Sequence, residues 1–146
     1  MTQPFTIRRT VQFSETDMAG VMHFSNYLRW MEDAEHAFWR SLGLSVHDAC
    51  RGEGGGLISW PRVAVNCQYS SPARFEDELE LTVRPVKLGA KSLTFEIEFR
   101  RGAARVALGT TTAVCCRVEP GGAFQAIAIP DAIRRRLTPF VDAAPT

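Results

Sequence analysis

Residues 13–34 read FSETDMAGVMHFSNYLRWMEDA, and the fold prediction depends on this stretch. Its first part, SETDMAG, is rich in turn-forming residues and carries Asp17 three positions before Gly20. Its second part opens a helix, predicted over about residues 25–42, because apolar side chains recur at spacings of three and four. These side chains are Tyr27, Trp30, Met31, Ala34 and Phe38.

Both ends of this helix carry recognisable signals. Ser25 or Asn26 can act as the N-cap, since either side chain can accept hydrogen bonds from the first-turn amides. We expect the helix to stop after Leu42, because Gly43 tolerates the left-handed conformation of a helix C-terminus. The face opposite the apolar stripe is charged and comprises Arg29, Glu32, Asp33, Glu35, His36 and Arg40.

The rest of the chain shows the alternation typical of strands. We predict strands over residues 5–13, 57–69, 79–86, 92–101 and 105–118, and a short helix over residues 131–137. The four strands after the long helix are expected to form a meander, with a turn at Gly102 joining the last two. A single helix must then cover the concave face of the sheet. The prediction is one α+β domain over residues 1–146, with a curved antiparallel five-stranded sheet wrapped around one long central helix.

Composition excludes several classes of protein. The chain has a formal net charge of +1, so no overall field favours nucleic acid or a membrane surface. Charges interrupt the first thirteen residues, and no apolar run approaches bilayer length, so we expect a cytoplasmic protein without a signal peptide or membrane span. The cysteines form no C-x-x-C pair, so buried free thiols are favoured over a metal or redox site. They are Cys50, Cys67, Cys115 and Cys116.

The stretch FSETDMAGVMHFSNYLRWMEDA closely resembles the opening motif of the 4-hydroxybenzoyl-CoA thioesterase group of hot-dog-fold proteins. In that group a T-D or C-D pair precedes a glycine by three positions, and an aromatic residue or histidine then leads to N-Y and an amphipathic helix. The strand order fits the hot-dog fold from about Thr6 to Leu137. The resemblance implies acyl-CoA thioester hydrolysis without a cofactor, since coenzyme A is part of the substrate. It also implies a homo-oligomer, a dimer or tetramer, in which sheets join and active sites lie between subunits.

The motif contains groups suited to this reaction. Asp17 is the candidate catalytic carboxylate, either attacking the thioester carbon or activating water as a general base. The alternative is an ordinary turn or capping residue. The free amides at the helix start suit a carbonyl oxygen that gains negative charge, and the resemblance assigns this role to the amide of Phe24. Gly20 lets the backbone approach the substrate. His23 either orients water and shuttles a proton or packs beside the helix.

A second candidate region lies in the turn before residue 92. By resemblance, Lys91 and Ser92 match a position that touches the nucleotide of coenzyme A, where a basic side chain pairs with phosphate. The alternative is that Lys91 is an ordinary hairpin lysine. The run at residues 134–136 is three arginines, which we interpret as the charged face of the last helix.

Two other functions stay open. A hot-dog dehydratase or hydratase would need a histidine with an acid, and His23 with Glu32 is one such pair. A non-catalytic acyl-CoA-binding module would be expected to lack the acid at position 17. A serine hydrolase is disfavoured because no G-x-S-x-G occurs. The acyl group is not determined: Trp30, Trp39 and Trp60 are compatible with an aromatic or aliphatic pocket, and equally with core packing.

Overall fold

The computed structural model describes residues 3–44 and 57–142. In chain order the elements are β1 (Phe5–Thr10), the 3₁₀ turn η1 (Phe13–Glu15), α1 (Phe24–Ser41), β2 (Leu57–Ser59), β3 (Arg62–Tyr69), β4 (Glu78–Leu88), β5 (Ser92–Arg101), β6 (Ala104–Val114), β7 (Cys116–Val118), β8 (Phe124–Ala126) and α2 (Asp131–Asp142). Cys50 and the glycine-rich segment at residues 52–56 lie outside the described residues. No helix within the described ranges has the length and apolar character that a bilayer crossing needs.

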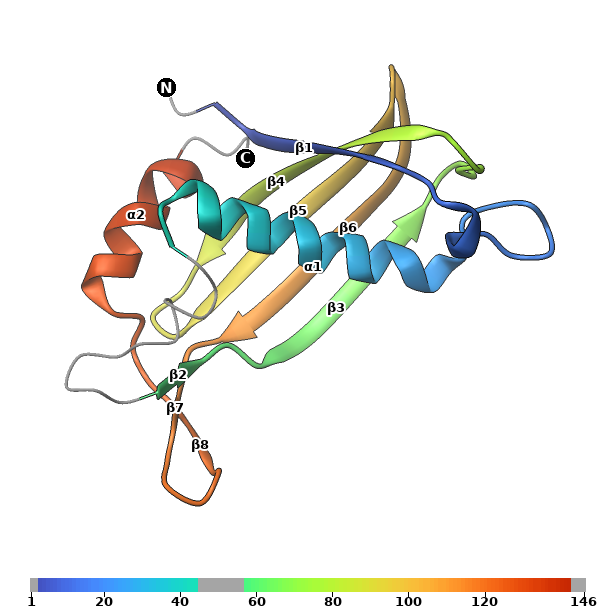
Figure 1. Cartoon of the computed structure of the whole chain (residues 1–146). Helices are drawn as coiled ribbons and strands as arrows, with labels where there is room; N and C mark the ends of the chain where they lie inside the picture. Colours follow the sequence, from blue (N-terminus) through green and yellow to red (C-terminus); the bar gives the residue numbers. More distant parts are fainter. Residues whose placement is uncertain (1–2, 45–56, 143–146) are drawn as a thin grey trace.

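The predicted α+β architecture is confirmed. Five antiparallel strands form one sheet in the order β1-β4-β5-β6-β3, and α1 lies across it (Figure 1). β5 has the predicted bounds, and its alternate side chains Leu93, Phe95, Ile97 and Phe99 are each at most 1% exposed. Burying each of these stabilises the fold by about 2 kcal/mol. The hairpin of β5 and β6 through Gly102 is also as predicted.

The predicted meander of four strands is wrong for β3. β4, β5 and β6 are consecutive neighbours, but β3 pairs with β6 at the far edge of the sheet. Because β1 already occupies the other side of β4, the strand that precedes β4 has only the β6 edge left. The connection from β3 to β4 therefore passes the start of α1, where the Met22 amide donates to the Ala73 carbonyl at 2.7 Å.

Two predicted strands are each divided in the structure. The one predicted over residues 57–69 breaks at Trp60 and Pro61, because proline has no N–H to continue a ladder. Its first part, β2, pairs with β7 in a separate small sheet that also includes β8, which the sequence did not predict. The strand predicted over residues 105–118 breaks at Cys115, between β6 and β7. Cys115 and Cys116 are buried and form no disulfide among the described residues, as predicted, and Cys67 is half-buried.

The start of α1 differs from the prediction, and its end does not. His23 is the N-cap, not Ser25 or Asn26: its imidazole Nδ1 accepts the amide of Ser25 at 3.2 Å. At the other end Gly43 has φ +76°, and its amide donates to the Arg40 carbonyl at 2.9 Å. A positive φ is what favours glycine there.

A close approach between α1 and the sheet depends on Gly109 of β6. A Cβ atom at this position would lie 2.5 Å from the sulfur of Met31, which is 2% exposed. Trp30 and Trp39 are also in this core, each 1% exposed, so core packing is the correct interpretation of both tryptophans. α2 packs beside the last part of α1 through Phe38 and Phe140, whose ring centroids are 5.0 Å apart (Figure 1).

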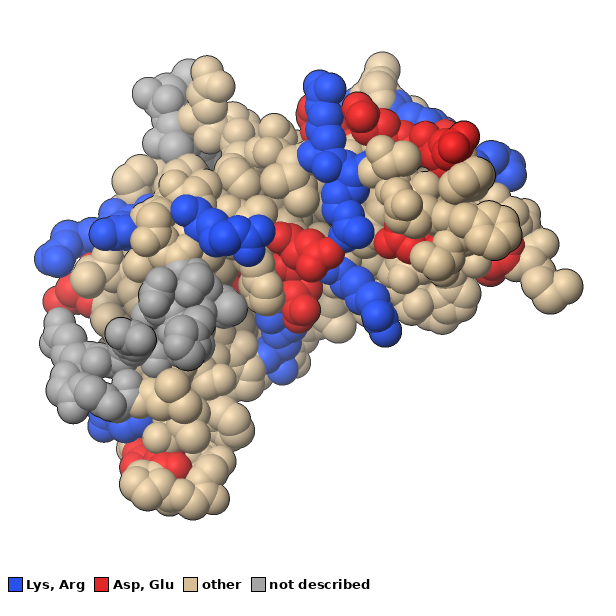
Figure 2. Space-filling model, in the orientation of Figure 1, with Lys and Arg blue, Asp and Glu red and all other residues tan. Residues whose placement is uncertain are grey.

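The run of arginines on α2 is more than a solvated face. Arg134 donates from Nη2 to the carbonyls of Gly89 and Ala90, at 2.7 and 3.1 Å. Arg136 donates to the Leu42 carbonyl near the end of α1. These two side chains therefore tie α2 to the β4–β5 turn and to α1. Elsewhere, on the face that carries α1, basic and acidic side chains are interspersed (Figure 2), which agrees with the small net charge.

Candidate functional site

The loop between η1 and α1 carries Asp17 in a compact, hydrogen-bonded conformation. Thr16 and Met22 form an isolated antiparallel bridge, which brings the two ends of the loop together. Inside it, the Asp17 amide donates to the Val21 carbonyl and the Gly20 amide donates to the Asp17 carbonyl, both at 2.9 Å. Gly20 has φ +77°, which L side chains rarely adopt, so the turn itself requires glycine.

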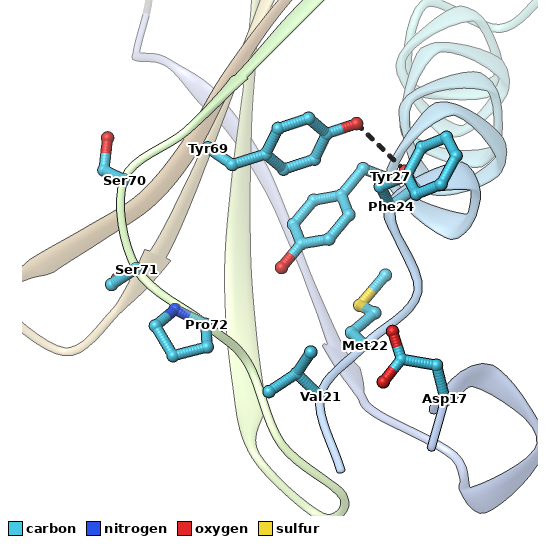
Figure 3. A pocket seen from close by; sticks show the side chains of 9 residues that line it. All are labelled: Asp17, Val21, Met22, Phe24, Tyr27, Tyr69, Ser70, Ser71 and Pro72. Atoms are coloured by element: carbon cyan, nitrogen blue, oxygen red, sulfur yellow. Dashed lines mark hydrogen bonds between the residues drawn. The ribbon is translucent and has the colours of Figure 1, made fainter. Parts of the chain in front are cut away.

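The Asp17 side chain is exposed and borders open space on two sides. One hollow, of about 380 Å³, is lined by Asp17, Phe24 and Tyr27 together with the end of β3 and the segment that follows it. Figure 3 shows Asp17 on one side of this hollow and Tyr69 on the other. A second hollow, of about 510 Å³, shares Asp17 and is lined by the exposed rings of Phe13 and Phe75. Asp17 Oδ1 accepts the Ala19 amide at 2.9 Å, which leaves Oδ2 as the atom open to a ligand.

The start of α1 faces the same hollow through Phe24. As the first residue of the helix, Phe24 has an amide without an intrahelical acceptor, and no acceptor for it occurs among the described residues. Its carbonyl accepts the Tyr69 hydroxyl at 3.0 Å (Figure 3). His23 is half-buried, stacks on Phe24 at 4.5 Å between ring centroids, and lies 2.7 Å through Nδ1 from Ser25 Oγ. Because Nδ1 is engaged in capping, only Nε2 is open for proton transfer.

Tyr27 and Tyr69 are site residues that the sequence did not single out. Their ring centroids are 4.9 Å apart at an interplanar angle of 84°, and both line the hollow beside Asp17. Burial raises the pKa of Tyr27, and burial likewise raises the pKa of Tyr69 to about 12. Both are therefore neutral phenols near pH 7. Tyr27 was interpreted only as part of the apolar helix stripe, and the 45-residue separation between Tyr69 and Phe24 gives no local signal.

Lys91 and Ser92 lie at the other end of the sheet. Lys91 is in the β4–β5 turn as predicted, with its carbonyl accepting the Cys115 amide at 2.7 Å, and Ser92 is the first residue of β5. Ser92 pairs with Val114 of β6, whereas Tyr69 of the hollow pairs with Ala107. Seven strand residues of roughly 3.3 Å each separate these points, about 23 Å in all. The structure therefore does not bring Lys91 and Asp17 together within one chain.

The acids of α1 do not join the hollow either. Glu35 is buried, and its Oε2 lies 2.5 Å from a guanidinium nitrogen of Arg62 on β3. Burial raises the pKa of Glu35, and the Arg62 charge only partly opposes this. Glu32 lies 3.9 Å from the same guanidinium, so its partner is Arg62 and not His23. The acid–histidine pair considered for a dehydratase is therefore not assembled.

Comparison with known proteins gives a consistent family. The family model described as the thioesterase-like superfamily matches residues 11–137. A 1,4-dihydroxy-2-naphthoyl-CoA hydrolase from Parasynechococcus marenigrum (strain WH8102) is 34% identical over 120 residues, which cover 75% of this chain and 76% of the relative. A solved structure of a hypothetical protein from Thermus thermophilus is 30% identical, with a TM-score of 0.79, and covers 92% of this chain and 98% of that one. A gentisyl-coenzyme A thioesterase structure is 26% identical, with a TM-score of 0.76, and covers 92% and 99%.

Proposed function

Because this chain belongs to the thioesterase-like superfamily, we propose that it is an acyl-CoA thioesterase that releases a free acid and coenzyme A. In this proposal Asp17 is the reacting carboxylate, and the amide of Phe24 polarises the thioester carbonyl. One observation carries the assignment: Asp17 and Phe24 line the same hollow, and neither Oδ2 of Asp17 nor the amide of Phe24 has a hydrogen-bond partner among the described residues. Among the described residues, Asp17 forms no ion pair and the Phe24 amide has no acceptor.

The geometry suits a reaction with a good leaving group. First-turn amides and the positive end of the helix dipole stabilise the negative charge that develops on the carbonyl oxygen. A thiol with a pKa near the cysteine reference of about 8.5 leaves without a strong general acid. One carboxylate and one helix terminus are then sufficient for hydrolysis, and no triad is needed.

Two routes are open to Asp17, and both consume one water molecule. In the first, Oδ2 attacks the carbonyl carbon, the C–S bond breaks, coenzyme A leaves as thiolate, and water then hydrolyses the mixed anhydride. In the second, Oδ2 takes a proton from water as the resulting hydroxyl attacks the same carbon, after which the C–S bond breaks, coenzyme A leaves as thiolate and the free acid is released. Oδ1 remains bound to the Ala19 amide in either route and fixes the orientation of the carboxyl group.

The acyl group is proposed to occupy the hollow beside Tyr27 and Tyr69. Aromatic rings accept aromatic partners edge to face, and both tyrosines are neutral near pH 7. The relative named above acts on an aromatic naphthoyl thioester. Aromatic acyl-CoAs are therefore the first class to test, with aliphatic ones for comparison.

Self-association belongs to the same proposal. We propose a homodimer or tetramer, because the sheet has two edges whose backbone groups lack partners in a single chain. The side chains along each edge decide which one pairs, and β3 is the candidate because it is exposed along most of its length.

The test is release of free thiol from a panel of aromatic and aliphatic acyl-CoAs, followed with a disulfide reagent. The reaction without substrate corrects for the protein's own four cysteine thiols. Chromatography must also recover the free acid in equal amount. A dehydratase, hydratase or binding module releases no thiol, so folded protein that releases none from any of the panel contradicts the proposal.

A further inference from the structure

We propose that Glu15 is a positioning residue that fixes the loop carrying Asp17 against α1. Glu15 lines neither hollow beside Asp17, so it acts through the loop and not on the substrate. The expected effect of Glu15 on kcat rests on the proposed thioesterase function. Its expected effect on structure, an ordered loop over residues 16–22, does not depend on that function.

The Glu15 carboxylate is almost enclosed and uses both of its oxygens. The side chain is 14% exposed. Oε1 accepts the Gln12 amide at 2.9 Å, and Oε2 accepts the indole N–H of Trp30 at 2.5 Å. Because Trp30 is 1% exposed, its N–H needs a partner inside the protein. The bond to Glu15 therefore links the base of the loop to the buried face of α1.

Arg9 of β1 adds a third element to this link. Its guanidinium nitrogen is 3.8 Å from Glu15 Oε2, and its guanidinium carbon lies 4.4 Å from the centroid of the Trp30 ring. Arg9 also pairs with Asp33, one turn further along α1. Glu15 is thus held between the first strand and the helix, with a positive charge beside it.

The backbone of Glu15 closes the loop from the same point. Its carbonyl accepts two hydrogen bonds at 2.8 Å, from the His23 amide and from Asn26 Nδ2. His23 is the N-cap of α1, so residue 15 is bound directly to the residue at which the loop ends. Together the carboxylate and the carbonyl of Glu15 fix both ends of residues 16–22 relative to the first two turns of the helix.

The attachment of the loop to α1 affects catalysis because the reaction needs two groups from different segments. Asp17 comes from the loop, and the Phe24 amide comes from the helix, so their separation depends on how the loop is attached. Displacement of a reacting group by about 1 Å costs on the order of 100-fold in rate. Glu15 is the residue that binds both segments at once, through its side chain to Trp30 and its main chain to His23.

A purely structural role for the Arg9 cluster is the competing explanation, and matched variants separate the two. Glu15→Ala removes the carboxylate bonds and leaves the backbone bonds possible. Glu15→Gln keeps the length and one acceptor oxygen, so it can retain one of the two bonds. Asp33→Asn is the control, because Asp33 is the other acid on Arg9 but is 57% exposed and has no contact with the loop.

Each variant is assayed for kcat and KM below its melting temperature, and its amides are followed by hydrogen exchange. For Glu15→Ala we expect kcat to fall about 100-fold with KM within about twofold. Exchange of the amides of residues 16–23 rises on the order of tenfold, while the core strands keep their protection. For Glu15→Gln we expect a kcat and a loop exchange rate between those of Glu15→Ala and the wild type. For Asp33→Asn we expect kcat, KM and loop exchange equal to those of the wild type.

Three results would overturn the positioning role. One is Glu15→Ala with kcat within twofold of wild type and unchanged exchange in the loop. Another is an equal loss in Asp33→Asn, which would assign the effect to the Arg9 cluster. The third is faster exchange throughout the core strands, which would indicate general destabilisation. If wild-type protein cleaves no thioester, the proposed function fails instead, and the loop exchange alone decides the role of Glu15.

Discussion

The two ends of the sheet differ in chemistry although the same strands run through both. At the end where α1 begins, Asp17 lies among exposed aromatic side chains and two open hollows. At the other end the β4–β5 turn carries exposed Lys91 and is closed by Arg134 of α2. The strand positions nearest to these two groups, Tyr69 and Ser92, are about 23 Å apart along the sheet, so the carboxylate and the candidate phosphate-binding lysine lie near opposite ends of it. A chain that uses both on one substrate needs either a very extended substrate or a second copy.

The two edges of the sheet differ, and the difference indicates where a second copy of the chain can bind. α1 lies across the sheet (Figure 1), and β1 alternates between half-buried and exposed residues and carries two charged side chains, Arg8 and Arg9. β3 is exposed along almost its whole length, and Val63 and Val65 are 62% and 53% exposed. Charged residues protect an edge from pairing, whereas exposed apolar ones favour it. We therefore expect self-association at β3 and not at β1.

Pairing of β3 with its copy about a two-fold axis is necessarily antiparallel. The Tyr69 end of one strand then lies beside the Arg62 end of the other. The Arg62 end is close to the β4–β5 turn, because Val114 both pairs with Ser92 and donates its amide to the Pro61 carbonyl. This arrangement would bring the Lys91 end of one copy towards the Asp17 end of its partner.

The largest effect is expected at the Asp17 end of the sheet. Asp17→Asn keeps the shape and the acceptor for the Ala19 amide but loses the ionised oxygen. We expect kcat for thiol release to fall about 1000-fold or more, with an unchanged melting temperature. The control is Asp33→Asn, the same change on an exposed acid of α1. If the Asp17→Asn protein keeps most of its activity, the reacting carboxylate is elsewhere.

The next prediction compares the two edges. Val65→Lys places a charge at an exposed position of β3, and Thr6→Lys places the same charge at an exposed position of β1. We expect light scattering to give an even oligomer for wild type and Thr6→Lys across a tenfold dilution, and a monomer for Val65→Lys. Thioesterase activity should fall in Val65→Lys together with the loss of the oligomer. A fully active wild-type monomer would contradict both the choice of edge and the shared site.

A smaller effect is expected at the Lys91 end. Lys91→Ala should raise KM for acyl-CoA about fivefold with little change in kcat, since an exposed ion pair to phosphate contributes uniform binding of up to about 1 kcal/mol. Lys87→Ala, another exposed lysine at the end of β4, is the matched control. An acyl-pantetheine thioester lacks the nucleotide and should show no difference between the variants. An equal rise in KM on that substrate would refute the phosphate contact.

The accuracy of the sequence predictions follows how local each determinant is. β5 was predicted to the residue because its alternation is uninterrupted, and the family resemblance carried by residues 13–34 is confirmed by the family match. The place of β3 in the sheet was missed, because which edge a strand takes depends on strands far away in sequence. His23 was missed as the N-cap because an imidazole acceptor is not a usual capping group.

Tyr69 and Glu15 reach the site through contacts across 45 and 15 residues, which no local pattern encodes. The roles of Asp17, Phe24, Gly20 and His23 stay predictions.

The smallest effect concerns Glu35, which joins α1 to the Arg62 end of β3. Burial raises the pKa of Glu35 above its ordinary value of 4.5, so the folded state binds a proton more readily than the unfolded state. The stabilisation from this group is complete below the ordinary pKa and is lost as the pH rises through the raised one. Glu35→Gln does not titrate, so the melting temperature of wild type minus that of the variant should decrease between about pH 4.5 and neutrality. Melting curves of both proteins over that range measure the difference, and other titrations cancel in the subtraction. A difference that grows with pH would mean that the attraction of Arg62 outweighs burial and that the pKa of Glu35 is lowered.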